Sequence, residues 1–451
     1  MPESSAKRSM KLLPKRLTAR IGQRPILAKV LDNIAWLVLD KALKLVLGIA
    51  VTAWLARYLG PESFGTYNYV IAFVALFSGF AALGVPTIAV RELVREADQR
   101  MAILGSTAAL LLVGGLLALG LVCLAAGLLR PDDEAMRAAV AVVAGALVFQ
   151  SSAVVRCWFE SQVSARYVVV AENLALVITA AVRVALIVLQ APLEAFFWVL
   201  LVEAALLAAL LFATYARRAG DLRRWRVTRA RASRLLRDSW PLALSGGVLM
   251  VQARLDQFML AEMAGVRQLG YYSVALRLAE SLAFFSVALQ SSLFPVLVEA
   301  RQQSAEAFRE KLLTFYRVCF LAALAVCVPV ACLSPWIVEW LFGPAYAPAG
   351  VLLALLSGRI LLAFMGTARS VYLTIENMQG HATLTIVAGT VLNLLLNLLW
   401  IPSHQALGAV WASLVSFAVT SFFIDLLFPR ARGNALVMMR AIATLPTIWR
   451  R

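Results

Sequence analysis

Charged side chains inside long apolar stretches are the residues of this sequence that could do chemistry. They comprise seven bases and six acids: Lys41, Lys44, Arg183, Arg254, Arg277, Arg317, Arg359, Asp40, Glu172, Glu203, Asp256, Glu280 and Asp425. A charge at the centre of a bilayer costs about 2.5–3.5 kcal/mol on insertion scales. The deeper ones must therefore face one another, the interior of a helix bundle or a wet cavity. Arg317, Glu172 and Asp425 lie near the ends of their stretches, where snorkelling to the surface lowers the cost.

Two pairs of these charges are spaced so that they could neutralise each other. Asp40 and Lys44 are one helical turn apart. Asp256 and Arg277 lie near the outer ends of two consecutive antiparallel stretches, so they would meet at one depth. Arg183, in contrast, has no acidic residue within a turn on its own helix, and the same holds for Arg359.

Bases at this depth that face a sheltered cavity can take part in function, whether or not an acid lies near them. Four of them sit at least a turn inside their stretches and are predicted to face a common lumen: Lys44, Arg183, Arg277 and Arg359. Arg254, Asn393 and Asn397 complete the predicted substrate-binding set, although the two Asn side chains could equally hydrogen-bond between helices. The candidates for linkage to protons or Na⁺ are the acids Asp40, Glu203, Asp256 and Glu280.

Catalytic and metal-binding motifs do not accompany these residues. The sequence has no Walker-A loop, no H-E-x-x-H and no G-x-S-x-G, and its two His and five Cys have no metal-ligand spacing. We therefore expect no cofactor, no metal and no enzymatic activity. ATP would have to act through another subunit.

The elements that position these residues follow from composition. The chain is 62% hydrophobic and 15% charged, whereas soluble domains have about 45–50% apolar and about 25% charged residues. A bilayer span needs about 20 apolar residues, and this length predicts an all-α integral membrane protein with about twelve transmembrane helices in two six-helix lobes around a central cavity. The runs are 33–55, 66–84, 103–128, 136–155, 167–189, 193–215, 240–260, 271–297, 312–333, 349–372, 382–400 and 408–428.

Basic residues then set the orientation. The segments on the side of the N-terminal tail carry 31 Lys and Arg, and the alternate loops carry 4. Since basic residues collect on the cytoplasmic side, both termini are predicted to be cytoplasmic and the protein to reside in the inner membrane. This asymmetry largely explains the net charge of +17, so binding to nucleic acid is not expected.

The predicted organisation is a basic cytoplasmic tail (1–32), a first lobe (33–215), an Arg-rich cytoplasmic linker (216–239), a second lobe (240–428) and a second tail (429–451). The linker, with nine Arg, is read as a solvated helix on anionic headgroups, with a regulatory or partner-binding role as the alternative. A faint repeat relates the halves. The pattern L-A-x3-G-x4-G-x-Y begins at Leu55 and again at Leu260, which favours two parallel repeats of six helices.

Several stretches resemble a known family. They are WLARYLGPESFGTY (54–67), GVPTIAVREL (84–93), RLDQFMLAEMAGVRQLGYYSVALRLAE (254–280) and WLFGPAYAPA (340–349). They are similar to bacterial polysaccharide exporters of the Wzx oligosaccharide-flippase type, in the multidrug/oligosaccharidyl-lipid/polysaccharide (MOP) superfamily. The resemblance implies a cationic cavity, alternating access, no cofactor and no enzymatic activity.

The substrate that the resemblance implies is an undecaprenyl-pyrophosphate-linked oligosaccharide, moved to the outer leaflet for O-antigen (lipopolysaccharide) or exopolysaccharide synthesis. Expected partners are the lipid bilayer, a polysaccharide polymerase and glycosyltransferases, with the chain acting as a monomer. The alternatives are an ion-coupled multidrug or cation exporter of the same superfamily, whose cavity should be acidic and aromatic, and a membrane polysaccharide polymerase. A lipid II flippase would have extra spans, and a major-facilitator transporter would have a characteristic loop between spans 2 and 3 that is missing here.

Overall fold

The computed structural model describes the backbone of residues 25–444 and the side chains of 44–444 except 283, 284, 288, 291 and 292. Within residues 25–444 every regular element is helical, which confirms the predicted all-α fold. Contacts divide the chain into unit 1, residues 1–51 and 77–246, and unit 2, residues 52–76 and 247–451. Residues 52–76, which the sequence assigns to the first lobe, therefore belong with the second half.

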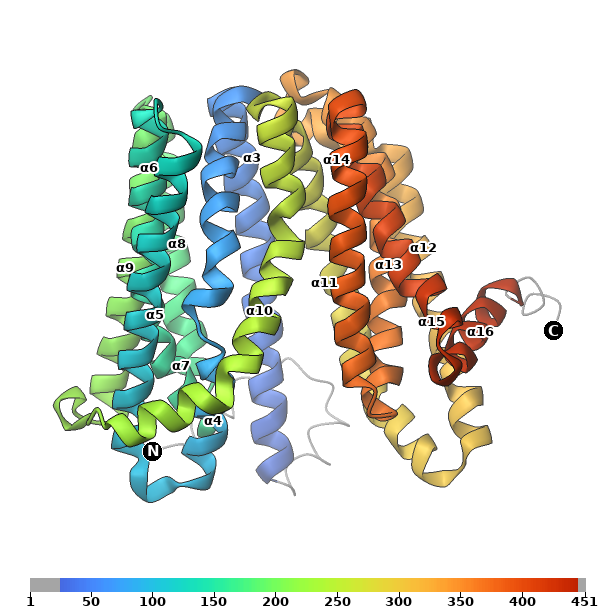
Figure 1. Cartoon of the computed structure of the whole chain (residues 1–451), viewed down its shortest axis with the longest axis horizontal. Coiled ribbons are helices and arrows are strands. Elements are labelled where there is room, and N and C mark those ends of the chain that lie inside the picture. The colour runs from blue at the N-terminus through green and yellow to red at the C-terminus, as the bar shows by residue number, and fades with distance from the viewer. Residues whose placement is uncertain (1–24, 445–451) are drawn as a thin grey trace. The chain divides into compact units, whose positions relative to one another are not determined.

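Unit 1 consists of helices that pack side by side around an apolar core (Figure 1). Besides the ends of α3 (Pro25–Ala81) and the start of α10 (Arg229–Ala264), it contains α4 (Val85–Arg95), η2 (Ala97–Gln99), α5 (Arg100–Leu129), α6 (Glu134–Ala144), η3 (Gly145–Ser152), α7 (Ala153–Ser161), α8 (Arg166–Val188), α9 (Leu193–Arg218) and η4 (Leu222–Arg224). Its core includes Leu93, Leu104, Phe159 and Tyr215.

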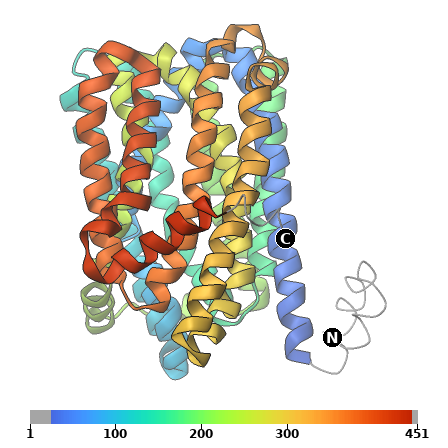
Figure 2. The same ribbon diagram turned by 90° about the vertical axis from the view of Figure 1, so that its right-hand side faces the viewer.

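Unit 2 is built around α13 (Pro348–Ile375), which contacts α11 (Val266–Gln303), α12 (Ala305–Phe342) and α14 (Gln379–Ala418). The chain continues through η5 (Pro344–Tyr346), the π-helix η6 (Val419–Phe423), α15 (Ile424–Leu427) and α16 (Pro429–Ala443). Figure 2 shows α16 lying across α12, and its Met438 is buried in the core there with Phe315 and Met365. The segment 429–443, predicted as a tail, is thus a packed helix.

Each of the twelve predicted runs coincides with a helical stretch of the described residues. Eight stretches are long and apolar enough to cross a membrane. Two of these hold two runs each, separated by non-helical backbone at Gly60 and at Gln405. The more polar α10 and α11 are not among the eight. Leu128 and Leu189 are each 75% exposed, an arrangement that suits lipid contact rather than water.

The sequence repeat is a packing element of unit 2. Gly60 and Gly265, at equivalent positions, have φ of 72° and 88° and begin the helical stretches that follow them. Five residues after each, Gly65 and Gly270 place their backbones against the other copy: a Cβ on Gly65 would overlap the carbonyl of Val266, and one on Gly270 that of Pro61. The two copies therefore cross at glycines because no side chain fits there.

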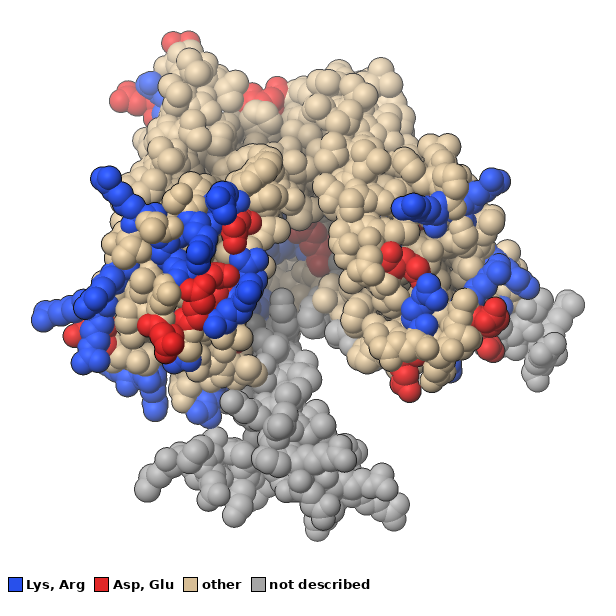
Figure 3. All heavy atoms as spheres, turned by 60° about the horizontal axis from the view of Figure 1, so that its bottom comes forward, with Lys and Arg blue, Asp and Glu red and all other residues tan. Residues whose placement is uncertain are grey.

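The Arg-rich linker is docked on unit 1 rather than fully solvated. Its Trp225 donates a hydrogen bond to Tyr215, with 3.0 Å between Nε1 and Oη. Arg231 is 6% exposed and donates to Glu92, Glu96 and Gln99. The hydrogen bond from Arg231 lowers the pKa of Glu96 below its ordinary value. The other eight Arg of the linker are exposed, and Figure 3 shows basic side chains gathered at this end of unit 1.

Candidate functional site

In unit 1, Lys44 belongs to a cluster of charges. Its Nζ lies 2.6 Å from Oε2 of Glu172 on α8, and Arg156 on α7 pairs with the other carboxylate oxygen. The side chain of Glu172 is 12% exposed, so it lies within the cluster and does not snorkel. The predicted partner of Lys44, Asp40, lies outside the described side chains. Lys44 therefore has an acidic partner that the sequence did not indicate.

The second base of unit 1, Arg183 on α8, is also paired. Its guanidinium contacts the carboxylate of Glu203 on α9, and the two side chains are 13% and 31% exposed. The helices α8 and α9 are joined by a short turn and pack against each other, which brings the two charges to one depth. Arg183 and Glu203, predicted as separate substrate and ion sites, thus form one ion pair.

In unit 2, Asp256 on α10 is buried and bonded to neutral groups. It accepts hydrogen bonds from Tyr272 Oη at 3.1 Å and from Asn397 Nδ2 at 2.7 Å. Asn397 also donates to Asn393, 3.0 Å away, and Asn393 donates to Ser416. Within the described part of the chain no ion pair joins Asp256 to Arg277, so the predicted pairing does not form. The two Asn side chains do bond between helices, which was one of the two readings.

The remaining predicted residues of unit 2 keep no charged partner. Arg359 is half-buried on α13 and stacks on Phe417, with 4.8 Å between the guanidinium carbon and the ring centroid. Arg254 is half-buried and Arg277 is exposed. Among the described side chains, neither Arg254, Arg277 nor Glu280 makes a hydrogen bond or an ion pair. Unit 2 therefore presents more unneutralised bases than acids in its spans.

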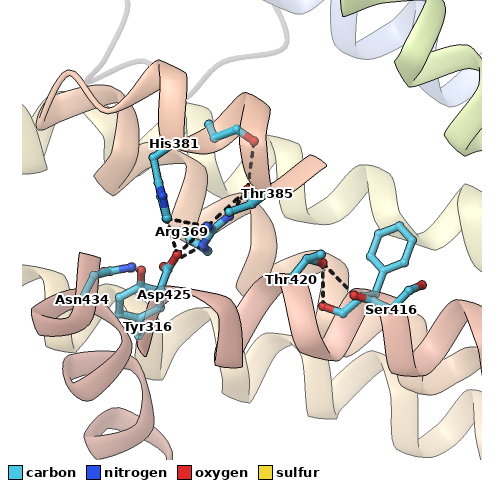
Figure 4. Close-up of polar contacts among 10 residues, drawn as sticks. Tyr316, Arg369, His381, Thr385, Ser416, Thr420, Asp425 and Asn434 are labelled. Carbon is cyan, nitrogen blue, oxygen red and sulfur yellow. Dashed lines mark hydrogen bonds and ion pairs between the residues drawn. The ribbon is translucent and has the colours of Figure 1, made fainter. Parts of the chain in front are cut away.

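A buried cluster that sequence reasoning missed lies at the adjoining ends of α13, α14 and α15 (Figure 4). Asp425 is 0% exposed and accepts from Arg369 Nε at 2.7 Å and Nη2 at 2.5 Å. His381 Nε2 lies 2.7 Å from the same carboxylate, and Thr385 accepts from Arg369. The prediction that Asp425 snorkels is wrong, because its carboxylate is buried and is contacted by both Arg369 and His381. The signal in the sequence was that Arg369, His381 and Asp425 all end their runs on the same side.

Chemically, this arrangement can bind charge but shows no catalytic constellation in its described residues. No group of three or more His, Cys, Asp or Glu that could hold a metal ion occurs among residues 44–444 whose side chains are described. It offers the Asp256 carboxylate, which is bonded to a phenol and an amide, and the guanidinium groups of Arg254 and Arg359, which have no acidic partner among the described side chains. These are features of ion and anion binding rather than of bond making.

The sequence model of the family "Polysaccharide biosynthesis protein" matches residues 30–301, more than half of the chain. The chain belongs to this family. Solved structures of other proteins resemble this polysaccharide biosynthesis protein and show which fold it has. An inward-facing multidrug resistance MATE family transporter of the MOP superfamily is 15% identical, with TM-score 0.67 over 87% of this chain and 95% of that one.

Two further structures share the fold of this polysaccharide biosynthesis protein. The lipid II flippase MurJ, in an inward closed conformation, is 12% identical, with TM-score 0.69 over 92% of each chain. A MOP superfamily transporter from Pyrococcus furiosus, described as having a binding pocket of reverse polarity, is 15% identical, with TM-score 0.60 over 91% of this chain and 96% of that one. No curated protein matches the sequence. These structures are of transporters and a flippase, and at 12–15% identity they show that this chain shares their fold.

Proposed function

We propose that the protein is a flippase that moves polyprenyl-pyrophosphate-linked oligosaccharide from the inner to the outer leaflet of the cytoplasmic membrane, by alternating access. The observation that carries the proposal is the set of unpaired bases in the spans of unit 2, Arg254 and Arg359 above all. A pyrophosphate carries its charge into a sheltered site only where guanidinium or ammonium groups replace water. Membership of the polysaccharide biosynthesis family supports an oligosaccharide as the cargo.

A cation or drug exporter of the same fold is favoured less by these residues. A site for a cation should present unpaired carboxylates and aromatic faces. Here Glu172 and Glu203 are each engaged by a base. Lys44 is paired with Glu172, and Arg183 is paired with Glu203. Arg359 and Arg254 are therefore the stronger candidates for binding an anion.

The first test replaces Arg359 with Gln. A charged hydrogen bond to phosphate is worth about 1.5–3 kcal/mol, so we expect export to fall roughly ten- to hundred-fold. Lys should restore only part of the activity, because it lacks the planar fork. The measurement is complementation of surface polysaccharide in a flippase-null strain, with membrane protein level quantified alongside.

Arg309→Gln, at an exposed position of α12, is the matched control and should retain full export. Arg183→Gln should reduce export less than Arg359→Gln, since Arg183 is already neutralised by Glu203. Full activity of Arg359→Gln at normal protein level would remove the anion-binding role from this residue and leave the function resting on the family alone.

Transport against a gradient without ATP needs a coupling ion, and we place it at Asp256. The carboxylate is 5% exposed, and the neighbouring Asn397 carbonyl oxygen, also buried, accepts no hydrogen bond from the described residues. A buried carboxylate beside a free amide oxygen suits a proton or Na⁺. Asp40, Glu203 and Glu280 remain candidates of lower weight. Glycosyltransferases before this step and a polymerase after it are the partners that the substrate implies.

Orientation follows from the charge asymmetry, and we propose cytoplasmic termini. Reporter fusions at Gly220 and Arg450 should both report the cytoplasm, and a fusion at Ala347 should report the outside. Gly220 is a suitable fusion site because it comes before Trp225 and Arg231, linker residues that make contacts with the rest of unit 1. An outside signal at Gly220 would contradict the span count.

A further inference from the structure

A row of polar and small residues winds along the first part of α14. His381, Thr385, Gly389, Asn393 and Asn397 follow one another at intervals of four residues, so they lie in a row on the helix surface. At 1.5 Å per residue the row extends for about 24 Å. That is most of the roughly 30 Å of a bilayer's hydrocarbon core.

The second part of α14 and the segment after it supply the opposing side of this row. Because the chain turns back at Gln405, the two parts form a hairpin. Asn393 donates to Ser416 at 3.4 Å, and Gly389 lies against the side chain of Thr420. Figure 4 shows Ser416 and Thr420 leading along the ribbon toward the cluster of His381 and Asp425. We call this row and its opposing side chains the polar seam.

The seam is buried and contains oxygens without partners. Thr385, Asn393, Asn397, Ser413 and Ser416 are each at most 4% exposed. The hydroxyl of Ser413 and the carbonyl oxygen of Asn397 have no hydrogen-bond partner among the described residues. Leaving a buried polar atom unpaired costs about 1–3 kcal/mol, so interhelical bonding alone does not account for these two.

The two free oxygens lie at one level of the seam. Asn393 bonds to Ser416, and one turn further along the antiparallel helices Asn397 and Ser413 come to about the same height. Asn397 is also bonded to Asp256. The end of the seam near Asp256 is therefore lined by oxygen atoms, which are the groups that a small hard cation takes as ligands.

The other end of the seam is closed by charge. Arg369 donates to Asp425 and to Thr385, and its Nη2 is 3.5 Å from Nε2 of His381. A guanidinium at this position opposes the passage of a cation for as long as Asp425 holds it in place. His381 Nε2 lies 2.7 Å from the same carboxylate, so His381 helps to fix Asp425 in this position.

We propose that the polar seam is the route by which the coupling cation, a proton or Na⁺, exchanges between Asp256 and the membrane face at which α14 begins, with Arg369, His381 and Asp425 as its gate. This rests on the proposed transport function and adds a path to it. The cation would be passed between oxygen ligands, from Asp425 along Thr385, Thr420 and Ser416 to Ser413 and Asn397. The π-helix Val419–Phe423 contains Thr420 and directly precedes the short helix of Asp425, and such helices are frequent at functional sites.

Several other ionisable groups face the two ends of the seam. Near Asp425 these are Tyr316 on α12 and Tyr372 on α13. The buried face of α16 presents Ala431, Asn434 and Ala435 toward the core and no titratable group. At the other end, Tyr272 feels the charges of Asp256, Arg359 and Glu280.

The test uses Ser413→Ala in the full-length protein. This hydroxyl donates no hydrogen bond to the described residues, so a structural role predicts an unchanged or higher Tm and unchanged transport. In proteoliposomes carrying polyprenyl-pyrophosphate oligosaccharide, we expect the component of flipping driven by an imposed Na⁺ or pH gradient to fall about tenfold, the effect of one hydrogen-bonding ligand. Flipping without a gradient and Tm should stay at wild-type values. Separate Na⁺ and pH gradients identify the ion.

A control variant sharpens the result. Ser370→Ala, on an exposed hydroxyl of α13, is the matched control and should keep the driven component. A driven rate within twofold of wild type for Ser413→Ala, or an equal loss for Ser370→Ala, would overturn the proposal.

A failure of the wild-type protein to flip the substrate would contradict the proposed function and not the seam. In that case Tm measured against NaCl, KCl and pH decides, because cation binding raises Tm without any substrate. Asp256→Asn should abolish the cation-dependent shift. Retention of the full shift in Ser413→Ala would then overturn the seam, and its loss would support it.

Discussion

Replacing Arg369 with Met is expected to destabilise the folded chain by about 3–5 kcal/mol, because it leaves a buried carboxylate without its counter-ion. Asp425 is 0% exposed and Arg369 is 8% exposed, so water cannot take the place of the missing guanidinium. The measurement is thermal unfolding of purified protein in detergent. The double variant Arg369→Met/Asp425→Leu should regain most of the loss, since replacing a whole buried pair by apolar groups is often neutral or stabilising.

The control for this prediction is an exposed pair in the same unit. Arg301 on α11 pairs with Glu376 beyond α13, and the two side chains are 44% and 25% exposed. Arg301→Met should cost no more than about 1 kcal/mol, as expected for a surface ion pair. Equal losses for Arg369→Met and Arg301→Met, or a double variant as unstable as the single one, would contradict the assignment of Asp425 as a buried charge.

Gly270→Ala is expected to be nearly as damaging, although it adds a single methyl group. The new Cβ would overlap the carbonyl of Pro61, and a backbone carbonyl cannot rotate away as a side chain can. Overpacking typically costs about 1–3 kcal/mol and occasionally more. We expect a lower Tm and less protein in the membrane fraction, and Gly65→Ala should behave in the same way because its Cβ would overlap Val266.

The matched change is Gly127→Ala in α5, where a Cβ would meet no atom within 4 Å. There the substitution should be neutral or stabilise by about 0.5–1 kcal/mol, because Ala favours a helix over Gly. A tolerated Gly270→Ala would show that the two copies of the repeat do not cross as closely as described.

Membrane spans were the part of the fold that the sequence predicts well. Length and hydropathy decide where a helix crosses lipid, and each of the twelve runs falls in a helical stretch. The partition into halves is less accessible. Residues 52–76 join unit 2 through contacts such as the hydrogen bond from Tyr69 Oη to Glu262, 2.5 Å long. A hydropathy profile does not reveal a contact between residues that are nearly two hundred positions apart.

The charge pairs show what sequence reasoning lacks. Depth in the membrane follows from position along a run, and by depth alone Asp256 suits Arg277 and Arg183 suits Glu203. Only the second pair exists, because a contact also needs the two side chains to point toward each other. Asp256 points to Tyr272 and Asn397, whereas Arg277 is exposed. The direction around a helix depends on neighbours that a single sequence does not specify.

The cluster of Arg369, His381 and Asp425 was missed for a related reason. Each residue ends a run, where a charge is unremarkable because it reaches water. Arg369 and Asp425 are 56 residues apart in the sequence. Nothing in that spacing shows that the ends of the three runs lie together in the structure. Counting charges of both signs at the same end of consecutive runs would have found them, and the same count applies to other chains of this fold.

The membership of residues 52–76 in unit 2 also affects the order of biosynthesis. Tyr346 donates to the carbonyl of Ala56, 290 residues earlier in the chain. At about 5–20 residues per second, translation takes roughly 15–60 s to cover such a distance. During that interval the early segment is already in the bilayer while Val266 and Tyr346 are still unmade. Unit 2 is therefore completed only near the end of synthesis. In a nascent chain interrupted at the linker, residues 52–76 would lie in the membrane without the residues against which they pack.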